Sequence, residues 1–287
     1  MLNYGIIAAL FGMLVYALGD TLSKRITMKL GHHESALLIV GASLIPLFLS
    51  FLVIQPNVID TSLVIVSVIS GIFLALGFLL VYKTLETEQV ANTMVLLNIE
   101  FIVVVLFGIF ALSEALPPLE MAALVTIFIG AFLVSLSKSM KFNRKMIPAV
   151  IGNVFWGLSF VVVAPYVYTD HSASTAFFFV ARLSAFIGLL IYLLVLARVR
   201  KASLFAHNVN KKEYLLTGFT GILDGLGQGS LVFLVIYNVA ALGGAILAIE
   251  PAVVAMLGFL LYKERLTHLQ FAGMLIALLG GVAIGLV

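Results

Sequence analysis

Long apolar runs, interrupted by charges, prolines and short polar clusters, fill almost the whole chain. Each run is close to the length of about 20 residues that an α-helix needs to cross a hydrocarbon layer of about 30 Å. The runs do not alternate between apolar and polar residues, which favours helices over a membrane barrel. They predict ten membrane-spanning helices, at residues 5–23, 35–54, 62–82, 89–112, 118–137, 147–168, 173–197, 214–237, 239–262 and 267–286.

The second half of the chain repeats the first. The residues that match at an offset of 150 include Glu100 and Glu250, Glu114 and Glu264, and Gly130 and Gly280, while Gly12 and Gly152 match at 140. Such a duplication has to be recognised before a fold is named. The boundary falls in the basic segment 138–145, so the sequence predicts two domains, 1–139 and 140–287, each with five spans.

An odd number of spans in each repeat places the second copy upside down in the membrane. The charges agree with this. Lys24, Arg25 and Lys29 follow the first span, whereas the equivalent connection 169–174 has no Lys or Arg. The predicted fold is therefore an all-α integral membrane protein with ten transmembrane helices in two inverted five-helix repeats. All loop Lys and Arg residues then face the side opposite both termini, which the positive-inside rule places in the cytoplasm.

The composition supports a membrane protein, because 63% of the 287 residues are hydrophobic, 10% are charged and the mean hydropathy is +1.22. A soluble core cannot bury so much apolar surface. The net charge of +3 does not indicate a nucleic-acid partner, since the basic residues lie between the apolar runs. There is no cysteine, and no cofactor or metal is expected. The first run reads as a span and not as a cleavable signal peptide.

The segment 259–266, followed by Gly273 and the pair 280–281, resembles the EamA domain of the drug/metabolite transporter (DMT) superfamily. The pair Trp156-Gly157 also fits, and the similarity covers the whole chain. The resemblance implies a carrier of small metabolites, often amino acids, that works by alternating access with a cavity between its repeats. It also implies that both termini lie in the cytoplasm, which the charge pattern contradicts, so the topology stays open.

The small multidrug relatives carry a proton-coupling Glu in the first helix, about two turns before a Lys. Here Lys24 is present, but Tyr16 takes the position of the Glu and Trp156 takes it in the second copy. Proton coupling is therefore expected elsewhere. Glu100 and Glu250 lie near the middle of their spans, where an acidic residue costs about 2.5 to 3.5 kcal/mol and marks function by default. The alternative is a protonated Glu that bonds a backbone carbonyl freed by Pro251.

Three polar residues deep within spans are candidates for substrate binding. Asp224 and Gln228 are four positions apart, so they share one face of a glycine-rich helix. Interhelical hydrogen bonding is the alternative role for both. Arg182 can pair with Asp224 or Glu250, or it can bind a substrate carboxylate with two parallel contacts.

Tyr16, Asn153 and Trp156 are candidates for lining the cavity, against helix packing or anchoring at the membrane interface. Asn98 and Asn92, near Glu100, are weaker candidates for substrate contact. The remaining polar residues are expected to be structural: Asp20 as a solvated or Lys24-paired helix end, His32 and His33 as a loop pair, and Glu114 and Glu264 as helix ends.

These observations favour a secondary active transporter, an exporter of small polar metabolites such as amino acids, in the plasma membrane of a prokaryote. Its partners are a small-molecule substrate, the lipid bilayer and, as a candidate coupling ion, protons. No phosphate-binding loop for ATP is present. The alternatives are a proton-coupled drug or cation efflux carrier, and a membrane scaffold or lipid scramblase. An enzyme is not expected, since an Asp20 and Asp224 protease pair lacks the local motifs of such a site.

Overall fold

The computed structural model describes residues 4–56, 59–94, 96, 99–100, 103, 117–135, 144–162, 173–201, 209–236, 247, 249–264 and 267–285. The described elements are α1 (Tyr4–Leu30), α2 (His32–Val53), α3 (Thr61–Leu85), α4 (Val90–Met94), α6 (Pro118–Ser135), η2 (Arg144–Met146), α7 (Ile147–Val161), α9 (Ala173–Arg200), α10 (Lys211–Ile236), α12 (Glu250–Tyr262) and α13 (His268–Gly285). All of them are helical, so the predicted all-α class is confirmed for these ranges.

Four of the described helices are long and apolar enough to cross a membrane: Ile7–Leu30, His32–Val53, Thr61–Leu85 and Ala173–Arg200. Three shorter apolar helices are Met121–Gly130, Glu250–Tyr262 and His268–Gly280. Large parts of the fourth and ninth predicted spans lie outside the described residues. The count of ten helices therefore stays a prediction.

Helix α2 shows why the membrane helices are apolar all round. Its interior face buries Leu37, Ile39, Val40 and Leu47, and its outer face exposes Ile45, Phe48, Leu49 and Leu52. A helix in water would need polar residues on its exposed face, whereas a helix in hydrocarbon satisfies its own backbone and needs none. The exposed apolar face of α2 is therefore a surface suited to lipid.

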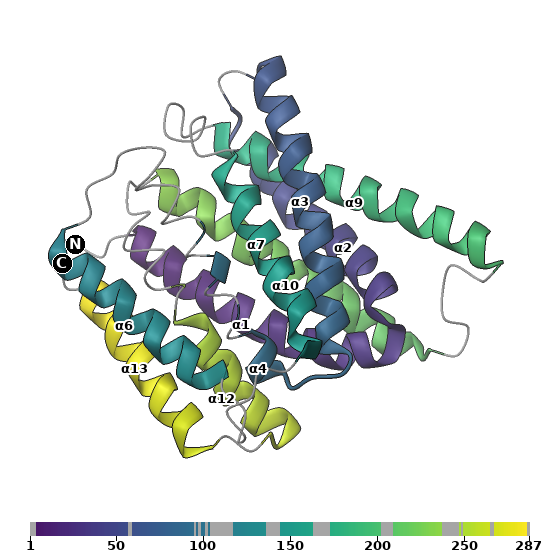
Figure 1. Cartoon of the computed structure of the whole chain (residues 1–287). Helices are drawn as coiled ribbons and strands as arrows, with labels where there is room; N and C mark the ends of the chain where they lie inside the picture. Colours follow the sequence, from purple (N-terminus) through teal and green to yellow (C-terminus); the bar gives the residue numbers. More distant parts are fainter. Residues whose placement is uncertain are drawn as a thin grey trace.

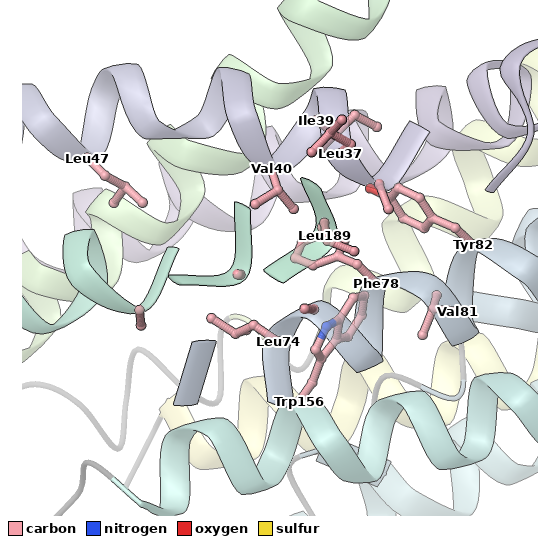
Figure 2. Packing of buried hydrophobic residues seen from close by; sticks show 14 of the residues in the cluster. Leu37, Ile39, Val40, Leu47, Leu74, Phe78, Val81, Tyr82, Trp156 and Leu189 are labelled. Atoms are coloured by element: carbon pink, nitrogen blue, oxygen red, sulfur yellow. The ribbon is translucent and has the colours of Figure 1, made fainter. Parts of the chain in front are cut away.

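The helices pack in pairs and layers, with α6 lying along α13 and α1 lying along α10 (Figure 1). Helix α3 packs against α7 and α9, and α2 packs against α9 and α10. Between α2, α3 and α9 lies the main apolar core, where Val40, Phe78 and Leu189 face one another and Trp156 reaches in from α7 (Figure 2). This core holds elements of both halves together.

Helices α6 and α13 touch through their glycines. A Cβ atom on Gly130 would lie 2.6 Å from the carbonyl oxygen of Gly273, and one on Gly280 would lie 2.9 Å from that of Ala123. Only the absence of a side chain permits these backbones to come so close. The two contacts are equivalent, because Gly280 lies 150 positions after Gly130 and Gly273 lies 150 positions after Ala123.

A second pair of contacts is also equivalent when the two halves of the chain are exchanged. The ring of Trp156 on α7 lies directly over Gly77 of α3, and the ring of Tyr16 on α1 lies directly over Gly227 of α10. Gly227 is the counterpart of Gly77 at an offset of 150, and Trp156 is the counterpart of Tyr16 at 140. Contacts between the halves thus recur with the two halves exchanged.

Polar contacts hold the C-terminal end of α1 to both halves. Arg25 Nη2 lies 2.5 Å from Glu213 Oε1 at the start of α10. Lys24 donates hydrogen bonds of 2.6 Å to the carbonyls of Leu85 and Glu88 at the end of α3. The connections after α1, after α3 and before α10 therefore lie at the same end of the protein, as the charge pattern predicts.

His32 and His33 do not form the loop pair expected from the sequence. Gly31 has a φ of 81°, a left-handed value that suits glycine, and it separates α1 from α2 in a single residue. His32 therefore begins α2, and its Nδ1 lies 2.8 Å from Glu86 Oε1 beyond the end of α3. The correction is that this pair belongs to a helix start that is bonded to a neighbouring helix.

Replacing Gly221 by Ala should destabilise the protein, because the new Cβ would lie 2.5 Å from the carbonyl oxygen of Ile39 and 2.6 Å from Ala42 Cβ. Overpacking of this kind costs about 1–3 kcal/mol. Gly218, three positions earlier on α10, is the matched control, since nothing lies within 4 Å of its added Cβ. Thermal unfolding in detergent should show a lower Tm for Gly221→Ala only. Equal Tm values for the two variants would contradict the packing of α10 against α2.

Candidate functional site

Polar side chains from four helices and from position 100 interact in the interior. They are Tyr16 and Asp20 on α1, Arg182 on α9, Asp224 and Gln228 on α10, Glu250 at the start of α12, and Glu100. Tyr16, for example, interacts electrostatically with Asp224 and with Arg182, far away in the sequence. Six of the nine predicted site residues therefore lie in one cluster, which we call the polar cluster: Tyr16, Glu100, Arg182, Asp224, Gln228 and Glu250.

Arg182 is the most deeply buried charged residue of the polar cluster, with 1% of its surface exposed. Its Nη1 lies 2.9 Å from Asp224 Oδ2, and its Nη2 donates a hydrogen bond to Gln228 Oε1. The guanidinium group also lies 5.1 Å from the centroid of the Phe78 ring, within the range of a cation–π contact. Of the two acidic partners considered from the sequence, Asp224 is the one that Arg182 contacts.

The α-helical period explains this arrangement. Residues four positions apart lie one above the other on a helix face, so α10 presents Asp224 and Gln228 to Arg182 together. The ion pair thus fixes α10 against α9.

Asp20 contradicts its expected role as a solvated or Lys24-paired helix end. Lys24 Nζ donates its hydrogen bonds to the backbone carbonyls of Leu85 and Glu88 instead. The predicted first span ended at residue 23, but α1 continues to Leu30. Asp20 therefore lies well inside the helix, where α1 packs against α12.

Glu250 is the first residue of α12, and Pro251 follows it in the first turn. A proline is well tolerated there, since its missing N–H has no intrahelical acceptor at a helix start. The described part of the chain therefore places Pro251 at a helix start. Glu250 is 8% exposed, so its carboxyl group is held inside the protein.

Trp156 and Asn153 make packing contacts. The Trp156 ring meets Phe78 edge to face, with centroids 5.2 Å apart, and Asn153 Nδ2 donates a hydrogen bond of 2.8 Å to Ala149 O on its own helix. Among the described residues, Asn153 Oδ1 and Trp156 Nε1 have no hydrogen-bond partner. Glu264 has the structural role expected, as its Oε1 accepts a hydrogen bond of 2.9 Å from Val90 N. Asn98, Glu114 and the Asn92 side chain lie outside the described residues.

The sequence matches the EamA-like transporter family twice, over residues 3–136 and 144–286. The chain belongs to this family. Its EamA regions cover nearly the whole sequence, and they meet between α6 and α7, close to the predicted repeat boundary. The resemblance to the DMT superfamily is thereby confirmed, and the protein is a membrane transporter of that type.

Comparison with solved structures gives the same fold. One chain, titled only "Crystal structure of protein", matches this EamA-like protein with a TM-score of 0.69 at 17% identity, over 97% of this chain and 98% of that one. A likeness at this identity shows the fold alone. Comparison with curated proteins gives no match. The substrate of this EamA-like protein therefore has to be argued from its own residues.

An apolar groove of about 390 Å³ opens beside the cluster, between α1, α2 and α10. It is lined by Tyr4, Ile7, Ala8, Phe11, Pro46, Ser50, Gly225, Leu226, Gly229 and Ser230. Tyr4, Ile7 and Phe11 are exposed on the outer face of α1. The groove therefore opens toward lipid, and none of the predicted site residues lines it.

A double-mutant cycle on Arg182 and Asp224 should show strong coupling. Arg182→Met or Asp224→Leu alone leaves an uncompensated charge in the interior, which costs about 3–5 kcal/mol. The double variant leaves neither charge and should be more stable than either single variant. The measurement is the free energy of unfolding in detergent by denaturant titration. Additive losses would mean that the two side chains do not form a significant ion pair.

Proposed function

We propose that this protein is a secondary active transporter that exports small polar metabolites, such as amino acids, by alternating access. The proposal rests on the polar cluster, in which acidic and basic groups from both halves lie between apolar helices. Charged groups there are costly and typically line the pathway of a substrate or an ion. The EamA family is a transporter family, which supports the same conclusion.

The charges of the cluster suit a substrate with both an ammonium and a carboxylate group. In the described part of the chain, Arg182 Nε has no hydrogen-bond partner, so it is available to a carboxylate. In this proposal the carboxyl groups of Glu100 and Glu250 bind the ammonium group. Tyr16, Asp224 and Gln228 complete the proposed substrate site, with Asn98, Asn153 and Trp156 as further candidates around it.

Two inverted five-helix repeats, with domains 1–139 and 140–287, supply the alternating motion in this proposal. The support is the recurrence of equivalent contacts, Gly77 with Trp156 and Gly227 with Tyr16, when the halves are exchanged. An exchange of this kind is what a two-fold relation between halves produces. The cavity then alternates between the two sides of a prokaryotic plasma membrane as the repeats rock against each other.

A proton-coupled cation efflux carrier is the second candidate function. It is favoured by an excess of acid, because Asp20 and the three acidic residues of the polar cluster, Glu100, Asp224 and Glu250, lie near a single guanidinium group among the described residues. A membrane scaffold or lipid scramblase would not exchange a specific substrate across the membrane, and this distinguishes it from both kinds of carrier. An aspartyl protease built on Asp20 and Asp224 is not favoured, because Asp224 is paired with Arg182.

The purified protein should bind its substrate and exchange it across a membrane. A panel of amino acids, amines and carboxylates is screened by thermal shift, since a ligand that binds the folded state raises its stability. Compounds that raise the Tm are then tested for counterflow in proteoliposomes. The proposal expects saturable counterflow of at least one amino acid. Counterflow of amines alone would favour the cation carrier, and lipid scrambling without counterflow would contradict both transport functions.

Labelling of single cysteines tests the inverted repeats, and the absence of native cysteine makes it direct. Cysteines placed near Lys141 and near Asp170 should react with an impermeant reagent from opposite faces of the membrane, because one span separates them. The face that labels position 141 also decides between the two topologies. Labelling of both sites from the same face would contradict the span count.

Glu250→Gln should abolish transport driven by a pH gradient while counterflow continues, because a Gln side chain cannot exchange a proton. Uptake of the substrate found by the panel is measured in proteoliposomes with and without a pH gradient. Glu100→Gln is assayed in parallel. If Glu250→Gln still accumulates substrate normally against its gradient, Glu250 is not the coupling residue.

A further inference from the structure

Six of the described helices form two bundles of three, and each bundle contains helices from both halves of the chain. Helix α10 packs against α1 and α2, and we call these three helices bundle A. Helix α3 packs against α7 and α9, and we call these three helices bundle B. Exchange of the two halves converts α1, α2 and α10 into α7, α9 and α3, so the two bundles are equivalent.

Glycines hold each bundle together through contacts between backbones. A Cβ on Gly221 of α10 would lie 2.5 Å from the carbonyl oxygen of Ile39 on α2, and one on its counterpart Gly71 of α3 would meet the carbonyl oxygen of Ala181 on α9. Between the bundles, side chains make the contact, as where the Phe186 ring of α9 packs on α2. Side chains adjust more easily than packed backbones. We therefore expect the bundles to move as units and to part from each other.

The polar cluster lies between the two bundles, because Arg182 of α9 contacts Asp224 and Gln228 of α10. A substrate can reach it from one side of the membrane only if the bundles part at that side. The contacts that join the bundles at each end therefore decide access to the cluster.

Lys24 joins the bundles at the side that carries the basic connections, which we call the basic side. Its Nζ donates hydrogen bonds of 2.6 Å to the carbonyls of Leu85 and Glu88. Leu85 is the last residue of α3, and the last carbonyls of a helix lack donors within that helix. A cation is also favourable beside the partial negative charge of a helix C-terminus. Bundle A thus caps the end of α3 in bundle B.

Glu86 makes a second contact in the opposite direction. It follows α3 directly, and its Oε1 accepts a hydrogen bond from the backbone N–H of His32 and lies 2.8 Å from His32 Nδ1. The residue before α2 is Gly31, which makes no side-chain cap, so Glu86 supplies the acceptor that a helix N-terminus needs. The ends of α2 and α3 complete each other, and we call Lys24, His32 and Glu86 the clamp.

The clamp has no charged equivalent in the sequence of the opposite side. At the repeat offsets of 140 and 150, its three residues are replaced by Ala164, Ser172 and Ile236. On that side Thr175 of α9 donates a neutral hydrogen bond of 2.9 Å to Ile54 O at the end of α2. Two equivalent bundles would close either side equally well. Charged contacts at one side therefore shift the equilibrium toward closure of that side.

We propose that the clamp holds the basic side shut and makes the conformation closed on that side the resting state of the protein. Opening toward the basic side requires Lys24 and Glu86 to release their partners. The two residues thereby control access to the polar cluster without contacting the substrate. This effect on access rests on the proposed transport function, whereas the clamping of the two bundles does not.

Distances between spin labels test the clamp without any substrate, using the purified protein in lipid and double electron–electron resonance. Labels at Met28→Cys and Lys83→Cys, exposed near the ends of α1 and α3, report how far the bundles part at the basic side. The wild type should show one dominant short distance. Lys24→Met and Glu86→Ala should each raise the ratio of a longer distance to the short one by about tenfold or more, since each removes hydrogen bonds of a charged group.

Lys29→Met and Glu88→Ala are the matched controls. Lys29 is an exposed lysine near the end of the same helix, and Glu88 accepts the bond from Lys24 through its backbone carbonyl, which the Ala variant keeps. Both controls should keep the wild-type distances. Lys24→Gln is a second variant if Lys24→Met does not fold. Wild-type distances in the Lys24 and Glu86 variants, or equal changes in the controls, would overturn the clamp.

Thiol labelling then tests the effect of the clamp on access. In sealed vesicles of known orientation, Tyr16→Cys should react with an impermeant reagent from the basic side several-fold faster when Lys24→Met is added, and at an unchanged rate when Lys29→Met is added. An unchanged rate with Lys24→Met would overturn the role in access. A wild type without counterflow for any compound would instead contradict the proposed transport function, while the spin-label distances would still decide whether the clamp joins the bundles.

Discussion

The burial of the Arg182 guanidinium group between membrane helices constrains much of this structure. A cation surrounded by apolar helices is stable only beside an anion, and Asp224 on α10 supplies it at 2.9 Å. This contact sets the rotation of α10, which in turn directs Gly221 toward the backbone of α2. The face of α10 that lies next to Asp224 and packs on α2 therefore needs small residues, and the sequence places glycines there at 221, 225 and 229.

Much of this arrangement could be predicted from the sequence, because it follows from local periodicity and from the duplication. Apolar runs of membrane length predicted helices. The spacing of Asp224 and Gln228 predicted a shared face, and both residues contact Arg182. The match between Glu100 and Glu250 in the two repeats predicted that both residues lie in the interior of the protein. These inferences need only the geometry of one helix or the comparison of one half with the other.

The partners of individual polar residues could not be predicted, because they depend on how distant helices rotate against each other. Asp20 illustrates this. Basic residues after position 23 suggested that the first span ended there, yet α1 continues to Leu30, so Asp20 lies inside the helix. Lys24 does not mark the helix end, because the backbone carbonyls of Leu85, at the end of α3, and of Glu88, just after it, accept its hydrogen bonds. An acidic residue inside a span indicates function by default. This rule would have made Asp20 a candidate if the first span had been predicted to continue well beyond residue 23.

The central claim is that the polar cluster opens to each side of the membrane in turn, and cysteine accessibility at Tyr16 tests it most directly. Tyr16→Cys is exposed to an impermeant thiol reagent from either face of sealed vesicles of known orientation. Gln55 lies just after the end of α2 and Asn210 lies just before the start of α10. Gln55→Cys and Asn210→Cys therefore report the two faces of the membrane. The account predicts that position 16 is labelled from both faces and positions 55 and 210 from one face each. Labelling of position 16 from one face only would contradict alternating access.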